Sequence, residues 1–560
     1  MTDAPNHEAD RPARRRMPRS PIAWGALTVA GLCVLPMAAV ALAAITGGTD
    51  TLGHLAATRL PLFVGNTAAL VLMVALGTAV IGTGTAWLVT MTEFRFRRLL
   101  EITLALPLAF PAYVMDYAYT RLLDHPGPVQ ALLRDVTGWG PRDYWFPEIR
   151  SLGGAAAMLI LVLYPYVYLL ARAAFLQQSG AVLLAARTLG HGSWSSFLRV
   201  ALPMARPAIA GGVLLAVMET IADFGTVSYF GVPTFATGIY QSWFSMADRG
   251  AAAQLALCLL TFALLLALLE RYQRGGARSH DKTGRFNAPP RLRLRGARAA
   301  AAAAACGLPM LLGFALPVGL LLSMGIGSGQ DLLSPRYLGF VGNSLTLAAT
   351  ASVATVGGAV LVSFALRLTP SRATRQAREV AQIGYAVPGG VIAVGLLVPF
   401  AAFDNALDRA MEASLGIDTG LLLTGSIWVL VLAYVVRFMA AALNAYDSGL
   451  GTIHPNVDAV ARTLGRGPAG MLRSVHLPIL TPSLLTALLI VFIDVMKELP
   501  ATLIMRPFNF DTLAVQAHRL ASDERLDGAA VPSLVIVAAG LLPVILVCRS
   551  VGRDKAGEER

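Results

Sequence analysis

Long apolar runs dominate this sequence and limit what it can fold into. A helix that crosses a bilayer needs about 20 consecutive apolar residues, and about twelve stretches reach that length. They lie near residues 22–45, 62–91, 99–122, 152–176, 208–230, 251–271, 299–322, 341–366, 379–403, 420–446, 483–505 and 529–549. Only 14% of the residues are charged, against roughly 25% in soluble domains. The sequence therefore predicts an all-α membrane protein with about twelve spans.

A short polar segment between two of these runs occurs twice. Residues 184–190 read LAARTLG and residues 459–465 read AVARTLG, and a Leu-Pro pair follows each copy at the same distance. The interval from Gly190 to Gly465 therefore equals the interval from Pro203 to Pro478, and we call this interval the repeat offset. A duplication at a fixed offset indicates that the chain contains two copies of one architecture.

The duplication extends through both halves. Gly65-Asn66-Thr67 recurs as Gly342-Asn343-Ser344, and the interval between these motifs equals the interval between Pro111 and Pro388. Each half contains an even number of spans, so the two copies are parallel. The predicted organisation is a tail (1–21), a first domain (22–271), a basic linker (272–298), a second domain (299–549) and a tail (550–560).

The basic residues predict the orientation. The side that holds both termini carries about 32 Lys and Arg residues and the opposite side about 11, which places the termini and both polar segments in the cytoplasm. The same clustering between spans argues against nucleic acid as the reason for the net charge of +12. The first apolar run, of about 24 residues, exceeds the 7–15 of a signal peptide core, so we expect a retained helix.

The composition of the repeated segment predicts a helix, a turn and a second helix along the membrane face. An Ala/Leu-rich stretch ends at Gly190 or Gly465, and glycine after such a stretch is a helix-ending signal. Pro203 and Pro478 stand where the next run begins, a position that permits a helix start or a kink. A short helix held in this way can serve as a mechanical contact for a cytoplasmic partner.

This pattern resembles the EAA loop of the permease subunits of binding-protein-dependent ABC importers. The matching positions are Ala186, Gly190, Leu202 and Pro203 in the first copy and Ala461, Gly465, Leu477 and Pro478 in the second. The resemblance implies two tandem six-helix domains of the MetI-like type I importer fold. It also implies that each loop presents a coupling helix to one of two copies of a separate ATPase subunit.

The glutamate of the family pattern is absent from both copies. Leu184 and Ala459 occupy its place, and Asp458 lies one residue before the second of these positions. The shape of the loop, set by glycine and proline, is therefore a firmer expectation than its charge.

Charged residues also occur within the predicted fifth and eleventh spans. Glu219 and Asp223 are four residues apart and share a helix face, and at the repeat offset they align with Asp494 and Glu498, next to Lys497. A charge at mid-bilayer costs about 2.5–3.5 kcal/mol on insertion scales, so these side chains should face the bundle interior or a water-filled path. They either line a translocation path or its gate, with transient contact to a metal ion at the four acids, or form a structural ion pair between Lys497 and an acid of the other half.

The two stretches that carry these charges, 218–227 and 494–503, resemble the fused permeases of ferric-iron importers. The resemblance implies ATP-driven alternating access that moves ferric iron from one extracytoplasmic binding protein across the inner membrane of a bacterium. It implies no catalytic residue and no cofactor in this chain, with ATP and Mg²⁺ held by the partner ATPase. Fused permeases for thiamine or 2-aminoethylphosphonate, a secondary transporter and a membrane-embedded enzyme remain alternatives.

Overall fold

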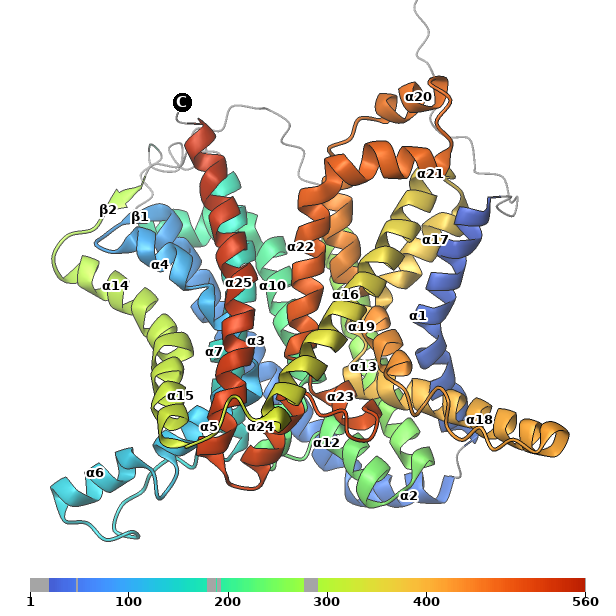
Figure 1. Cartoon of the computed structure of the whole chain (residues 1–560). Helices are drawn as coiled ribbons and strands as arrows, with labels where there is room; N and C mark the ends of the chain where they lie inside the picture. Colours follow the sequence, from blue (N-terminus) through green and yellow to red (C-terminus); the bar gives the residue numbers. More distant parts are fainter. Residues whose placement is uncertain (1–19, 47–48, 179–187, 189–192, 276–290, 559–560) are drawn as a thin grey trace, which may run out of the picture.

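The computed structural model describes residues 20–46, 49–178, 188, 193–275 and 291–558, and it is built almost entirely of helices (Figure 1). Ten helices of this described part are long and apolar enough to cross a membrane. Of the two remaining predicted spans, the third is a helix pair bent by 97° and the twelfth is α25, whose described apolar stretch is Leu526–Leu542. The predicted class, an all-α membrane protein with about twelve spans, is confirmed.

The long helices of the two halves follow each other in the same order, and some short elements occur in one half only. The first half contains α1 (Pro21–Thr46), α2 (Thr49–Thr58), α3 (Leu60–Met91), β1 (Thr92–Glu93), α4 (Arg97–Thr103), η1 (Leu106–Ala109), α5 (Ala112–Leu123), α6 (Pro128–Thr137), α7 (Leu152–Gln177), α9 (Ser193–Ser196), η2 (Phe197–Ala201), α10 (Leu202–Ala222), α11 (Gly225–Tyr229), α12 (Phe235–Tyr240), η3 (Gln241–Ser245) and α13 (Arg249–Gly275). The second half contains β2 (Leu292–Arg293), α14 (Ala297–Met310), η4 (Leu311–Ala315), α15 (Leu316–Gly327), α16 (Pro335–Leu368), α17 (Arg372–Ala381), η5 (Ile383–Ala386), α18 (Gly389–Leu415), α19 (Ile427–Leu450), α20 (Pro455–Thr463), α21 (Pro468–Met471), η6 (Leu472–His476), α22 (Leu477–Met496), α23 (Pro500–Met505), α24 (Leu513–Ser522) and α25 (Leu526–Glu558).

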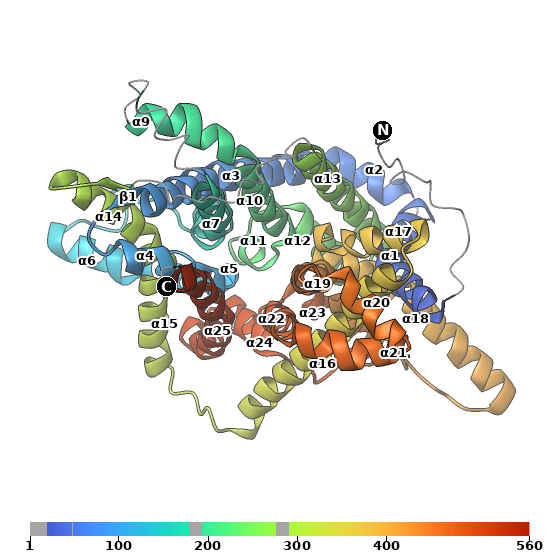
Figure 2. The ribbon, with the colours of Figure 1, turned by 90° about the horizontal axis from the view of Figure 1, so that it is seen from above.

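Each half is built around three helices that pack against one another. These are α3, α7 and α10 in the first half and α16, α19 and α22 in the second. Seen from above, the two cores lie next to each other (Figure 2). The first helices of each half reach across, because α1 packs against α16, α17 and α18, while α14 and α15 pack against α3, α4 and α5.

The repeated Asn motif has the same structural role in both halves. The Asn66 side chain donates a hydrogen bond to the Pro233 carbonyl (2.9 Å), just before α12, and Asn343 donates to the Asp511 carbonyl (3.1 Å), just before α24. A half-buried amide donor with a backbone acceptor fixes the approach of a loop that apolar contacts alone would leave free. Each motif therefore ties the long helix α3 or α16 to the segment that leads into α12 or α24.

Four of the predicted spans are interrupted rather than continuous. The third and ninth break at Pro111 and Pro388, which precede α5 and α18, because proline lacks the N–H that a helix interior requires. The fifth and eleventh break after Ala222 and Met496, before the short helices α11 and α23. Each of these four stretches is a single apolar run in the sequence, because apolar length does not indicate where a helix stops.

Each half contains an ion pair at equivalent positions, and the positive and negative residues are exchanged between the two halves. Arg172 on α7 pairs with Glu101 on α4 in the first half. At the equivalent positions of the second half, Asp447 on α19 pairs with Arg378 on α17 at 2.6 Å. Pairing α4 with α19, or α17 with α7, would bring like charges together, and like-charge contacts disfavour wrong partners. The reversed polarity therefore favours pairing within each half.

A two-stranded parallel sheet adds one exception to the helical class. Thr92 pairs with Leu292 and Glu93 with Arg293, so β2, at the end of the basic linker, lies against the turn that follows α3. This contact fixes the point at which the chain enters α14.

Candidate functional site

Two carboxylates lie directly at the breaks that follow α10 and α22. Asp223 accepts a hydrogen bond from the backbone N–H of Thr226 (3.1 Å), at the start of α11. Glu498, its counterpart in the second half, accepts from the N–H groups of Ala501 (2.9 Å) and Thr502 (3.1 Å), at the start of α23. A side-chain oxygen that accepts from the first N–H groups of a helix caps that helix. Helix capping is therefore one reason for an acidic residue at each break.

A cavity of about 130 Å³ lies beside these breaks, between the two halves. Six charged side chains line it: Glu219, Asp223, Arg437, Asp494, Lys497 and Glu498. The structure thus brings together all five residues that the sequence singled out as path or gate residues, and it adds Arg437. A charge within the tenth predicted span was the signal that could have identified Arg437, because intramembrane charges usually mark function.

Tyrosines connect the halves across this cavity. The Tyr385 hydroxyl, on η5 of the second half, donates a hydrogen bond to Glu219 Oε1 at 3.2 Å. The Tyr113 hydroxyl, on α5 of the first half, donates to the backbone carbonyl of Lys497 at 3.3 Å. Tyr113 lies next to the break at Pro111 and Tyr385 next to the break at Pro388. The two equivalent prolines were therefore the sequence signal that could have identified these tyrosines.

The ion pair of Lys497 lies within its own half. Its Nζ is 2.8 Å from Asp494 Oδ1, three residues earlier on the same chain segment. The sequence left open a salt bridge from Lys497 to an acid of the first half. Among the described residues, Lys497 forms its salt bridge with Asp494 instead. At this cavity, the hydrogen bonds of Tyr113 and Tyr385 connect the halves.

Gly389 allows the charged groups of the second half to approach the start of α18. A Cβ at this position would lie 2.7 Å from both Arg437 Nη1 and Glu498 Oε1. Real Cβ atoms do not approach other heavy atoms that closely, so a side chain here would push at least one charged group away. Arg437 Nη1 has no hydrogen-bond partner among the described residues, and it is therefore available to a ligand or to water.

The cavity carries more acid than base but does not form a chelating site. Four carboxylates and two cationic side chains line it. Within the described residues, no three His, Cys, Asp or Glu side chains are arranged to hold a metal ion.

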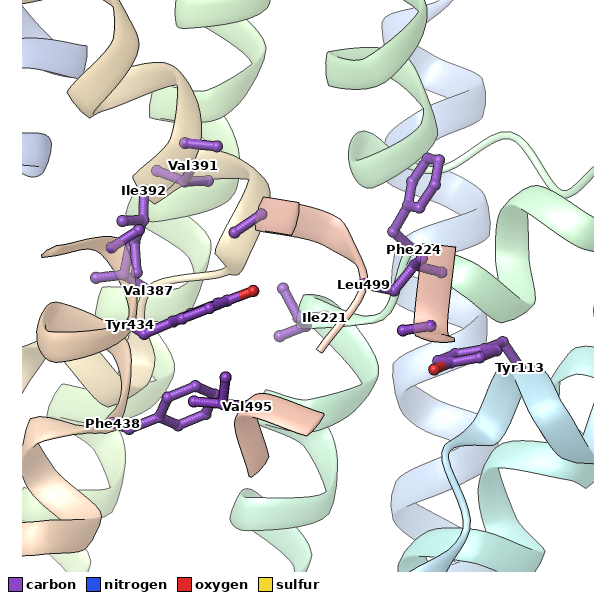
Figure 3. Close-up of a cluster of buried hydrophobic side chains, with 14 of the residues drawn as sticks. Tyr113, Ile221, Phe224, Val387, Val391, Ile392, Tyr434, Phe438, Val495 and Leu499 are labelled. Carbon is purple, nitrogen blue, oxygen red and sulfur yellow. The ribbon is translucent and has the colours of Figure 1, made fainter. Parts of the chain in front are cut away.

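Apolar side chains from both halves surround the break segments. Figure 3 shows Ile221 and Phe224 from the first half and Tyr434, Val495 and Leu499 from the second, all buried. Their burial excludes water around the short capped helices and so strengthens the hydrogen bonds of Asp223 and Glu498.

The second polar segment has the predicted helix–turn–helix form. The helix α20 ends at Thr463, and Gly465 has a φ of 75°, the left-handed conformation that favours glycine after a helix. The next helix runs through the π-helical turn η6 into α22, with Pro478 in the first turn of α22. In Figure 1, α20 and α21 lie across the end of the bundle at which α25 also ends.

The first polar segment is described only in part. Ala186 and Gly190 lie outside the described residues, whereas Leu202 and Pro203 begin α10 directly after the π-helical turn η2. The π turn before a proline therefore occurs in both halves. A wider turn removes the clash between a proline ring and the preceding helical carbonyl.

Asp458 faces inward and clamps α20 to the bundle. Its carboxylate accepts a hydrogen bond from Arg367 Nε at 2.6 Å and lies 2.8 Å from His476 Nε2. Arg367 also donates to the carbonyls of Leu450 (2.9 Å) and Ile453 (2.8 Å). Burial raises the pKa of Asp458, but the hydrogen bonds from Arg367 and His476 outweigh it and hold that pKa below its ordinary range. Asp458 therefore does not replace the missing glutamate on the outer surface.

The outer face of α20 is apolar and exposed. Val460 and Leu464, one helical turn apart, are 56% and 74% exposed, while Ala461 between them is buried against the bundle. Leu477 begins α22 and is half-buried. Exposed apolar side chains at helical spacing are typical of a surface that another protein covers, and sequence reasoning, which concentrated on glycine and proline, missed them.

Comparisons with known proteins agree with this geometry. Residues 80–278 match the family model described as binding-protein-dependent transport system inner membrane component. The chain is 23% identical over 544 residues to the Fe(3+)-transport system permease protein FbpB 2 of Haemophilus influenzae, covering 95% of this chain and 99% of the relative. It is 22% identical over 434 residues to the ferric transport system permease protein FbpB of Actinobacillus pleuropneumoniae, covering 74% and 60%.

A further relative covers a smaller part of the chain. A protein described as a putative 2-aminoethylphosphonate transport system permease, PhnV of Salmonella typhimurium, is 28% identical over 199 residues, covering 36% of this chain and 69% of the relative. The relative from Haemophilus influenzae, by contrast, is matched over nearly its whole length. Residues 80–278 thus match the inner membrane component of binding-protein-dependent transport systems, and the chain as a whole is similar to fused permeases named for ferric-iron transport.

Proposed function

We propose that this permease moves ferric iron from an extracytoplasmic binding protein into the cytoplasm. The observation that carries the proposal is the cavity between the halves, where Glu219 and Asp223 of one repeat meet Asp494 and Glu498 of the other. Ferric iron is a hard cation that prefers oxygen ligands, and carboxylates and phenols supply them here. The full-length similarity to a permease named for Fe(3+) transport supports the same cargo.

The transport cycle follows from how the halves are connected. Two copies of a cytoplasmic ATPase subunit bind at the two polar segments, and these subunits hold the ATP and Mg²⁺. At the second polar segment, the exposed face of α20 is the contact. Their closure moves α20, and the clamp at Asp458 passes that motion to α16, α19 and α22. The halves then rock, the Tyr385–Glu219 contact opens, and the cavity accepts cargo from the binding protein. This chain itself makes and breaks no covalent bond.

The orientation belongs to the same proposal. The start of α1, the end of α25 and α20 lie at one end of the bundle, and the arginine-bearing helices α4 and α17 lie toward the same end (Figure 1). We assign this end to the cytoplasm of a bacterium. The long segment 123–150 and the segment 404–418 then face the binding protein.

A phosphonate is the alternative cargo that a specific observation favours. Arg437 and Lys497 both line the cavity, and paired cationic groups bind phosphonate oxygens well. Thiamine is the further alternative that the resemblance implies, and its cation would depend on the same acids.

The test uses the permease reconstituted in liposomes with its ATPase and binding protein. We expect ATP-dependent uptake of radiolabelled ferric iron and none of labelled thiamine or 2-aminoethylphosphonate. Glu219→Gln should lower iron uptake without releasing the ATPase, whereas Asp331→Asn, a matching change at an exposed acid that neither lines the cavity nor lies in a segment assigned to the binding protein, should have no effect. Phosphonate uptake in place of iron would reassign the cargo, and uptake without ATP would indicate a secondary transporter.

A further inference from the structure

A buried carboxyl group near the cavity has no hydrogen-bond partner in the described part of the chain. Asp116, on α5, is 0% exposed, and neither of its oxygens has a hydrogen-bond partner among the described residues. Burying such a group without a partner costs several kcal/mol. Each unsatisfied polar group of this kind therefore requires an explanation, such as water or a passing ion.

Two further polar atoms near Asp116 are unsatisfied in the same way. The Thr120 hydroxyl, one turn further along α5, and the Tyr229 hydroxyl, on α11, have no partner in the described part of the chain by hydrogen-bond geometry. Tyr229 lies close to both Thr120 and Asp116. Asp116 in turn lies close to Thr226 and Asp223, and Asp223 lines the central cavity.

The same line continues toward the end of the bundle opposite α20. The Arg150 guanidinium lies over the Tyr229 ring, 5.3 Å from its centre. Arg150 donates two hydrogen bonds to Glu524, at 2.6 and 2.8 Å, and lies 3.2 Å from Asp124. Polar groups therefore follow one another from this surface, through Tyr229, Thr120 and Asp116, to the cavity.

Residues from both halves border this line. Tyr117 and Tyr229, of α5 and α11, contact each other with ring centres 4.9 Å apart. The Tyr117 hydroxyl is 3.2 Å from His518 Nδ1, on α24 of the second half, and Phe224 lies beside the same imidazole. A relative movement of the halves therefore changes the width of this region.

The repeat provides an internal comparison. At the intervals that relate Pro111 to Pro388 and Gly190 to Gly465, the positions of Asp116, Thr120 and Tyr229 correspond to Ala393, Leu397 and Ile504. Equivalent helices in the second half are thus built with apolar side chains at all three positions. The fold does not require polar groups here, so their presence in the first half points to a function.

We propose that Asp116, Thr120 and Tyr229 line the outer section of the cargo's route, between the surface at Arg150 and the central cavity, and that this section passes a hard, oxygen-seeking cation. The proposal rests on the proposed function. The groups are strung along a line, and no three acidic or histidine side chains in the described residues surround one point. Such an arrangement gives a succession of weak contacts rather than a storage site, as conduction requires.

Cysteine labelling tests the route independently of the cargo. In a background with Cys33, Cys258, Cys306 and Cys548 replaced by Ser, Thr120→Cys would be compared with Leu397→Cys, its counterpart in the second half. The reconstituted complex, with ATPase and binding protein, receives a cationic thiosulfonate reagent from the outer side, with and without ATP. Ala118→Cys, on the opposite face of α5 and equally buried, is the second control.

We expect Thr120→Cys to react at least about tenfold faster during ATP turnover than without ATP, and about tenfold faster than either control, because only this position opens to a charged reagent. Asp116→Asn should in addition lower iron uptake by about the same factor as Glu219→Gln. Equal reaction at Thr120→Cys and Leu397→Cys, or no reaction at Thr120→Cys during turnover, would overturn the route. If the wild-type complex took up no iron, the cargo proposal would fail while the labelling pattern still decided the route.

Discussion

The clamp around Asp458 makes a quantitative prediction for Asp458→Asn. Asparagine keeps the shape of the side chain but loses the charge that Arg367 and His476 face. A hydrogen bond to a charged group contributes about 1.5–3 kcal/mol, and Arg367 keeps its bonds to the Leu450 and Ile453 carbonyls. We therefore expect the variant to weaken the attachment of α20 by about one such bond, about 1.5–3 kcal/mol.

Hydrogen–deuterium exchange of the purified permease measures this loss. Since about 1.4 kcal/mol corresponds to a factor of ten, the backbone amides of α20 should exchange roughly 10- to 100-fold faster in Asp458→Asn. Asp447→Asn is the matched control, because its ion pair with Arg378 also lies between helices of the second half but does not contact α20. Unchanged exchange in Asp458→Asn, or an equal acceleration in Asp447→Asn, would refute the clamp.

The pH dependence of the clamp has a defined sign. The pKa of Asp458 is lowered in the folded protein, so its stabilising contribution is complete above the ordinary Asp value of about 3.9 and disappears as the pH falls through the lowered folded value. Exchange of α20 in the wild type should therefore not accelerate through loss of this carboxylate between pH 8 and pH 5.

Three further predictions concern other parts of the molecule. Arg378→Glu should lower the thermal unfolding midpoint of the purified permease by an amount equivalent to about 1–3 kcal/mol, and adding Asp447→Arg should restore most of it, because the pair of the first half already has that polarity; no recovery in the double variant would contradict this. Gly389→Ala should reduce ATP-dependent uptake severely, while Gly390→Ala, whose Cβ meets only a contact at 4.0 Å, should be tolerated; equal uptake by both variants would show that the close approach is unimportant. Leu464→Glu should abolish co-purification of the ATPase at that loop, since it places a charge on the exposed apolar face of α20; unimpaired co-purification would remove this face from the coupling surface.

Hydropathy and repetition predicted the class of the fold because they report on burial, but they could not predict where helices stop. Ten of the twelve apolar runs correspond to described helices that are long and apolar enough to cross a membrane, and the other two correspond to the bent helix pair and to α25. The Asn66 and Asn343 motifs have equivalent partners. The breaks at Asp223 and Glu498 depend on side-chain oxygens that cap the following helix. A window average over apolar residues contains no information on capping.

The candidate site could be predicted in composition but not in pairing. The cost of charge in a bilayer and the repeat offset were enough to predict one interior position for five residues, Glu219, Asp223, Asp494, Lys497 and Glu498. The partners could not be inferred, because Tyr385 reaches Glu219 from a distant segment of the other half. Asp458 illustrates the same limit, since its inward direction depends on Arg367, which lies on another helix.

The two halves share a backbone arrangement but carry different polar and charged side chains. The first half carries Asp116, Thr120 and Tyr229, whose counterparts in the second half are apolar. The second half carries Arg437, Lys497 and Asp458, whose counterparts at the repeat offset are Val162, Ala222 and Leu183. Two identical subunits related by symmetry would have to present each of these groups twice. Fusion of the halves removes that constraint, so each half can carry charged and polar groups that the other lacks.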